Sequence, residues 1–121
     1  MEGVTDRPRQ IGDLTEILAD AKAAGAVWRV AEEPRQLDAN VIHLPAGDRI
    51  ASHQGPDLDV LIHVLAGGGR LDSGEQSLEL TPGALVWLPR GSQRAVVAGP
   101  DGLTYFSVHP KRPPLGITRP S

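Results

Sequence analysis

Short apolar runs separated by glycine and proline dominate this chain and restrict the folds that it can adopt. Fourteen glycines and eleven prolines are spread over the 121 residues, and they stand between the apolar runs instead of gathering in one tract. Runs bounded in this way, about ten residues apart, are typical of β-strands in a sandwich or a barrel. The expected strands cover residues 27–31, 39–44, 58–65, 77–80, 84–88, 94–98 and 103–108. Two further segments, residues 67–69 and 99–102, are expected to be turns.

One segment before the first expected strand has the periodicity of a helix instead. Asp13 stands three residues before Glu16, which is the spacing of a capping box, and Gly25 is a suitable stop. Apolar residues at helical spacing between them predict one amphipathic helix over residues 13–24. The expected organisation is a flexible arm over residues 1–10, a single domain over residues 11–109 and a proline-rich tail over residues 110–121.

Composition excludes several classes of protein. The chain has no cysteine, so disulfides, thiolate metal sites and cysteine nucleophiles are ruled out. Its net charge of -3 argues against a general nucleic-acid binder, which needs a basic surface to displace counterions. No apolar run approaches the roughly 20 residues that span a bilayer, and the polar first ten residues contain no signal-peptide core. A cytoplasmic protein with no nucleic-acid or membrane partner is therefore expected.

The spacing of the turn residues is more specific than their number. Two sets stand in order along the chain: Gly47, His53, Gly55, Val60 and Gly67, then Gly83, Pro89, Gly91 and Arg94. Glycine and proline at such places allow strands to turn sharply. In order and spacing these sets resemble the two signature motifs of the cupin family, and the resemblance extends over residues 37–108. It implies a cupin-type β-barrel, which is a double-stranded β-helix or jelly roll, with one short N-terminal α-helix.

The same resemblance shows a departure from the family. Metal-binding cupins hold iron, manganese or a similar ion with three histidines and one glutamate that face into the barrel. This chain keeps only His53, and Gly55, Val60 and Arg94 stand at the other three positions. One imidazole does not hold a divalent ion against water, because stable sites need three or four protein ligands. The resemblance therefore implies the barrel without its usual metal, and no cofactor is expected.

A rebuilt metal site is the alternative. Side chains alternate along a strand, so if Val60 faces into the barrel, Asp59 and His63 face away from it. A new ligand set would then have to combine His53 with Asp57, or with a histidine from a neighbouring strand. The chain offers two such histidines, His43 and His109.

Three polar residues are candidates for contact with a small molecule in the barrel. His53 is expected at the mouth, where it could act as a general base or bind the ligand, or could simply bond a backbone carbonyl. Arg94 stands where an inward histidine would be, and its guanidinium suits a carboxylate or a phosphate, unless it pairs with Asp57 or Asp59. Gln93 is the third candidate, although it is expected to point the opposite way from Arg94.

Three classes of function follow from this reading. The first is the binding of a small organic ligand, taken to be anionic, by Arg94 and His53. The second is an isomerase, epimerase, cyclase or lyase in which His53 is the base and Arg94 stabilises an enolate or a carboxylate. The third is a structural or regulatory partner with a vestigial pocket. A homodimer is expected by resemblance. Trp87 is interpreted as a core or interface residue, and Tyr105 as part of an outer face packed against another sheet or subunit.

Overall fold

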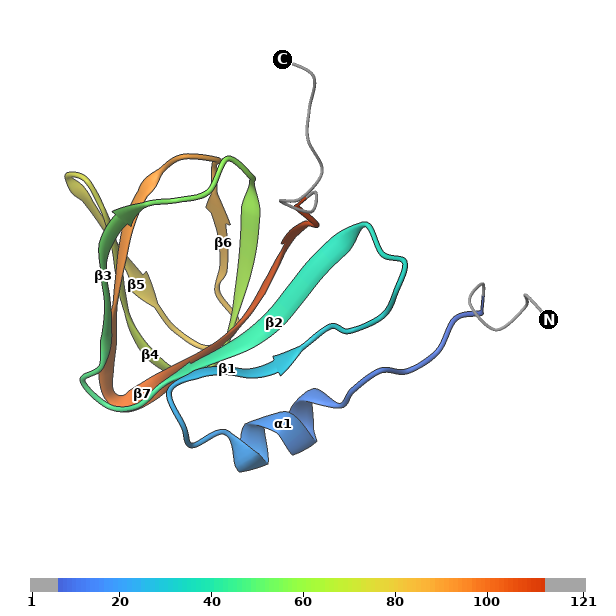
Figure 1. Cartoon of the computed structure of the whole chain (residues 1–121). Helices are drawn as coiled ribbons and strands as arrows, with labels where there is room; N and C mark the ends of the chain where they lie inside the picture. Colours follow the sequence, from blue (N-terminus) through green and yellow to red (C-terminus); the bar gives the residue numbers. More distant parts are fainter. Residues whose placement is uncertain (1–6, 113–121) are drawn as a thin grey trace, which may run out of the picture.

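The computed structural model describes residues 7–112, which form one helix and seven strands (Figure 1). The helix α1 covers Leu14–Asp20; the strands are β1 Gly25–Arg29, β2 Leu37–Leu44, β3 Arg49–Gln54, β4 Val60–Ser73, β5 Gln76–Leu80, β6 Leu85–Leu88 and β7 Gln93–Pro110. The expected all-β barrel with one short N-terminal helix is confirmed.

The barrel has two walls, and two long strands belong to both. The first wall contains β1, β2, residues 103–110 of β7, the first part of β4, and β6. The second wall contains β3, residues 93–98 of β7, residues 69–73 of β4, and β5. All these pairings are antiparallel. Since β4 and β7 pass from one wall to the other, they close the fold around a shared interior, as Figure 1 shows.

Glycines form the corner where β4 and β7 change walls. Gly67 has a φ of 72°, and a Cβ atom there would lie 2.1 Å from the carbonyl oxygen of Gly102. A Cβ atom at Gly69 would lie 2.1 Å from the carbonyl oxygen of Val97. The two backbones therefore touch at the corner, and only residues without side chains allow this approach.

Both predicted turns are wrong, because the two segments form this corner inside continuous strands. Residues 67–69 lie inside β4 and residues 99–102 lie inside β7, so each segment bends a continuous strand and neither ends one. The hairpin between β4 and β5 instead turns at Gly74, which lies between the paired residues Ser73 and Gln76. Glycine allows a sharp change of direction both at a turn between strands and at a bend within one strand, so the sequence pattern does not distinguish the two.

One strand was not predicted from the sequence. In β3 only Ile50 is a large aliphatic residue, and nearly all of the strand is exposed because it pairs with β7 alone. A short polar edge strand lacks the apolar alternation on which prediction depends.

The N-terminal helix begins where it was expected and ends earlier. The carboxylate of Asp13 caps α1 by accepting hydrogen bonds from the backbone N–H groups of Thr15 and Glu16, at 2.9 and 3.2 Å. The helix stops at Asp20 and not at residue 24, since Ala21 already has an extended backbone. The apolar side of this short helix packs near β1, where Leu14 and Ile17 line a cavity of about 340 Å³ with Trp28.

The outer face of the first wall leaves apolar side chains exposed. Leu61 and Trp87 are register partners on β4 and β6, and Leu85 lies beside His63. Trp87 is 59% exposed, so it is not a core residue. The homodimer stays a prediction, and this face now offers the apolar surface that it would need. No helix in residues 7–112 is long and apolar enough to cross a membrane.

The predicted arm and tail are only partly within the described residues. Arg9 of the arm pairs with Glu32. At the other end, β7 extends to Pro110, and the backbone N–H of Lys111 donates to the carbonyl of Gln36 at 2.9 Å. The remainder of the predicted arm, residues 1–6, and of the predicted tail, residues 113–121, lies outside the described residues.

Candidate functional site

The interior between the two walls contains a cavity of about 260 Å³. Seven aliphatic side chains make most of its lining: Ile42, Ile50, Val60, Ile62, Leu71, Leu88 and Val96. Five polar side chains complete it: Asn40, His53, Arg94, Tyr105 and Ser107. The cavity therefore combines an apolar body with a small number of polar groups, which is the usual composition of a small-molecule site.

Arg94 is the charged group of this cavity. It lies on β7 opposite His53 of β3, and its side chain is buried, with 6% of its surface exposed. Its Nε donates to the carbonyl oxygen of Ser92 at 3.3 Å, and Nη2 donates to the Pro89 carbonyl at 3.3 Å and to the Ser92 hydroxyl at 2.8 Å. No Asp or Glu within residues 7–112 forms an ion pair with it. Burial lowers the pKa of Arg94 from its ordinary value, an effect that Tyr105 partly opposes.

Gly55 makes room for this guanidinium. A Cβ atom at Gly55 would lie 2.2 Å from Nη2, 2.3 Å from Cζ and 2.7 Å from Nε of Arg94. Any side chain at residue 55 would therefore occupy the space that the guanidinium fills. The glycine at residue 55 thus accommodates the arginine at residue 94.

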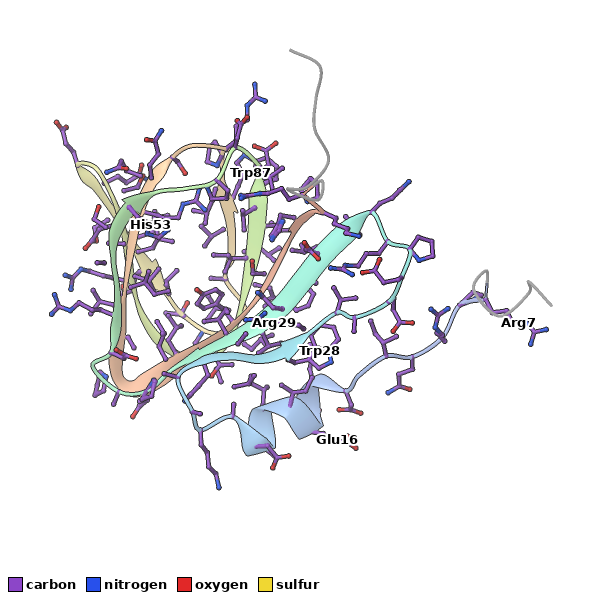
Figure 2. All side chains as sticks on the ribbon, in the orientation of Figure 1. Arg7, Glu16, Trp28, Arg29, His53 and Trp87 are labelled. Carbon is purple, nitrogen blue, oxygen red and sulfur yellow. The ribbon has the colours of Figure 1, made fainter. Side chains whose placement is uncertain are left out.

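His53 is an exposed residue that also lines the cavity. Its Nδ1 lies 2.9 Å from the carbonyl oxygen of Ala51. Because a carbonyl oxygen only accepts, Nδ1 carries the proton in this bond. In this tautomer the lone pair lies on Nε2, which forms no hydrogen bond among residues 7–112. Figure 2 shows His53 on β3, and this arrangement lets Nε2 accept a proton.

Tyr105 belongs to the interior, so its assignment to an outer face was wrong. Its side chain is buried and lines the same cavity as Arg94. Burial raises the pKa of Tyr105 to about 12, and the guanidinium of Arg94 opposes part of this rise. The phenol is therefore neutral at physiological pH and keeps its O–H proton for donation to a ligand.

The ionisation of Tyr105 gives a direct test of this arrangement. Tyr105 is the only tyrosine, so tyrosinate absorbance after a rapid jump in pH reports this residue alone. We expect a pKa of about 12 in the folded protein and a still higher value in Arg94→Gln, which lacks the cation that stabilises tyrosinate. Since the folded pKa exceeds the unfolded value of about 10, burial of the neutral phenol stabilises the fold below about pH 10.

That stabilisation should be lost as the pH rises from about 10 to 12, and about two pKa units correspond to roughly 2–3 kcal/mol. The free energy of unfolding of Tyr105→Phe should lack this decline. A native pKa near 10, or no change in pKa on removal of Arg94, would contradict the placement of the two groups around one cavity.

Several predicted residues lie away from the cavity. Gln93 pairs with Gln54 and is exposed, so its contact with a ligand stays a prediction. Asp57 is 91% exposed and lies 3.8 Å from Arg90, and Asp59 accepts from the Arg90 backbone N–H at 3.0 Å. The alternative in which either carboxylate pairs with Arg94 is therefore wrong.

The two histidines considered for a rebuilt metal site, His43 and His109, do not line the cavity with His53. Nδ1 of His43 lies 2.7 Å from the hydroxyl of Thr104, and Nδ1 of His109 lies 2.8 Å from the carbonyl oxygen of Pro110. His63 is absent from the cavity lining while Val60 and Ile62 are part of it, as the alternation predicted.

The residues at the four motif positions do not fit a divalent metal. His53 supplies one neutral nitrogen, Gly55 and Val60 supply no side-chain donor, and Arg94 places a cation where a ligand would stand. Among residues 7–112, no three His, Asp or Glu side chains gather closely enough to hold an ion. The described residues of this cavity therefore offer no set of ligands for a divalent ion.

Sequence reasoning missed Asn40, Tyr105 and Ser107 as interior residues. Along β7, Arg94 and Val96 face inward at even positions, whereas Tyr105 and Ser107 face inward at odd positions. The register of β4 against β7 shifts between Gly67 and Gly69, which reverses the parity across the corner. If strict alternation were continued from Arg94 along β7, Tyr105 and Ser107 would be assigned to the outward face. Their inward orientation can be predicted only if the position of the bulge is known.

Comparison with known proteins supports the fold alone. No protein-family model matches the sequence, and no curated protein matches it significantly. A cupin-2 domain containing protein from Shewanella frigidimarina is similar in structure, with a TM-score of 0.70 and 14% identity over 84% of this chain and 95% of that chain. The cupin domain of Cnp3 from Schizosaccharomyces pombe has a TM-score of 0.62 and 15% identity over 70% of this chain and 59% of its own.

The DMSP lyase DddQ from Ruegeria pomeroyi is a third similar structure, with a TM-score of 0.57 and 26% identity. The match covers 69% of this chain and 41% of the lyase. The present chain thus spans less than two thirds of the Cnp3 domain and of the lyase. Together with the two-walled barrel and its corner glycines, these similarities establish the chain as a small single-domain protein of the cupin fold.

Proposed function

We infer that this protein binds a small anionic organic molecule in the barrel, with Arg94 as the group that holds the anion. The observation that carries this proposal is a buried guanidinium that lines a cavity and has no carboxylate partner in residues 7–112. A buried charge without a counter-ion is costly, because its lost hydration is not offset. An anionic ligand would provide that offset.

The unused hydrogen-bond donors of the Arg94 guanidinium support the same conclusion. Nε and Nη2 are used by Ser92 and Pro89, whereas Nη1 has no partner among the described residues. These internal bonds hold the planar group in place, so its free N–H groups are preorganised for an incoming oxygen. The cavity lining contains no Asp or Glu that would repel an anion.

The size of the site limits the ligand to a compact molecule. A cavity of about 260 Å³ lies just below the usual range of about 300–1,000 Å³ for small-molecule pockets. The aliphatic residues that form most of the lining favour a ligand with an apolar body. We therefore propose small carboxylates as the first ligands to test.

Arg94→Gln should weaken the binding of small carboxylates by about tenfold to a hundredfold, because a charge-assisted hydrogen bond is lost. Isothermal titration calorimetry with benzoate and other short monocarboxylates measures this effect. Arg90→Gln is the matched control, since Arg90 is a neighbouring arginine with an exposed side chain outside the cavity. Equal affinities in wild type and Arg94→Gln would contradict the proposal.

The geometry of His53 favours a second candidate, which is an enzyme with acid–base chemistry. The bond from Nδ1 to Ala51 leaves Nε2 able to accept a proton from a ligand held by Arg94. The structural similarity to a DMSP lyase is compatible with this class of reaction. Exchange of the hydrogen beside the carbonyl of small oxo-acids for deuterium, followed by NMR, tests it: His53→Gln should abolish exchange and retain binding.

A further inference from the structure

A second polar cluster faces the cavity from the other wall. Asn40 of β2 and Ser107 of β7 are register partners in the first wall, and Tyr105 precedes Ser107 by two residues on the same side of β7. Arg94 and His53 are register partners in the second wall. Figure 1 shows β2 and β3 on different sides of the barrel, so a ligand in the cavity would meet one cluster at each wall.

The side chains of this second cluster have hydrogen-bonding capacity that the protein does not use. Within residues 7–112, the Asn40 amide, the Tyr105 hydroxyl and the Ser107 hydroxyl form no hydrogen bond. Tyr105 is buried, and Asn40 and Ser107 are half-buried. No side-chain polar atom among residues 7–112 is both fully buried and without a partner, so these three groups still reach the cavity space and can bind a ligand there.

The chemistry of the cluster selects an uncharged polar group. Asn40 and Ser107 can each donate and accept, and Tyr105 keeps its proton at physiological pH. No ionised side chain lies among the three residues. A hydroxyl or a carbonyl oxygen suits such a set, whereas a second charge would be buried without a counter-ion.

We propose that the ligand is a small bifunctional acid, in which an acidic group binds Arg94 and a hydroxyl or carbonyl group at the other end binds Asn40, Tyr105 and Ser107. A compact apolar body joins the two groups and packs on the aliphatic lining. This inference rests on the proposed function, since it adds a second point of recognition to the anion site.

Matched pairs of acids test the inference by calorimetry. One pair is benzoate and para-hydroxybenzoate, and the other is pentanoate and its terminally hydroxylated analogue. In each pair the hydroxylated acid is expected to bind about fivefold to tenfold more tightly, the usual effect of one buried hydrogen bond. Ser107→Ala and Asn40→Leu should each reduce this preference and leave the affinity for the unsubstituted acid nearly unchanged.

Ser73→Ala is the control, because Ser73 is a half-buried serine of β4 outside the cavity lining, and it should keep the full preference. If the unsubstituted acids bind through Arg94 and the hydroxylated ones bind no better, the second cluster is not a recognition site and only this inference fails. If no acid binds, or if binding ignores Arg94→Gln, the proposed function fails and this inference with it. Circular dichroism confirms the fold of each variant; if Asn40→Leu is unfolded, Ser107→Ala decides alone.

Discussion

Gly67→Ala is expected to destabilise the barrel by about 3–5 kcal/mol, a large share of the stability of a domain of this size. The residue has a φ of 72°, where a side chain costs about 1–2 kcal/mol in backbone strain. In addition, the new Cβ atom would lie 2.1 Å from the carbonyl oxygen of Gly102. Because that obstacle is backbone, relief requires β4 and β7 to separate at the corner where both change walls.

Gly74→Ala isolates the contribution of the clash. Gly74 also has a positive φ, of 61°, but a Cβ atom there would meet nothing within 4 Å. Only the backbone strain remains, so a loss of about 1–2 kcal/mol is expected. Urea denaturation followed by circular dichroism compares the two variants. Equal losses would mean that the corner can open without cost and that close backbone contact there does not hold the walls together.

The corner also explains which parts of the fold could be predicted from the sequence. Strands such as β2, β5 and β6 have apolar residues that alternate toward one core, and their predicted positions agree with the structure within a few residues. The glycines of β4 were interpreted as a turn, since a glycine run carries no side-chain pattern that distinguishes a bend from a hairpin. That distinction depends on a neighbouring strand, which is a tertiary contact.

The candidate site was predictable to a similar extent. The spacing of the motif residues identified His53, Val60 and Arg94, and all three line one cavity. Tyr105 and Asn40 were not identified as cavity residues. Tyr105 lies beyond the corner, where the bulge reverses the alternation of inward and outward residues, and Asn40 lies outside both motifs. Burial of Arg94 could not be read from its position alone, because it depends on the space that Gly55 leaves.

Gly55→Ala is expected to remove the anion site while Arg94 is still present. The added Cβ atom would lie 2.2 Å from Nη2 and 2.3 Å from Cζ, so the guanidinium must leave its place. Its hydrogen bonds to Ser92 and Pro89 would be lost with it. Carboxylate affinity should therefore fall by about tenfold to a hundredfold, as in Arg94→Gln, because charge-assisted hydrogen bonds of this kind have that effect.

A double-mutant cycle separates this displacement from a general loss of structure. In the Arg94→Gln background the guanidinium is absent, so Gly55→Ala should cause little further loss of carboxylate affinity. Residues in direct contact commonly show coupling of about 0.5–3 kcal/mol, and the same range is expected for the free energy of unfolding. Additive effects would show that the two residues act independently. Strong coupling would mean that Gly55 and Arg94 form one functional unit, in which the glycine leaves the space that the guanidinium fills.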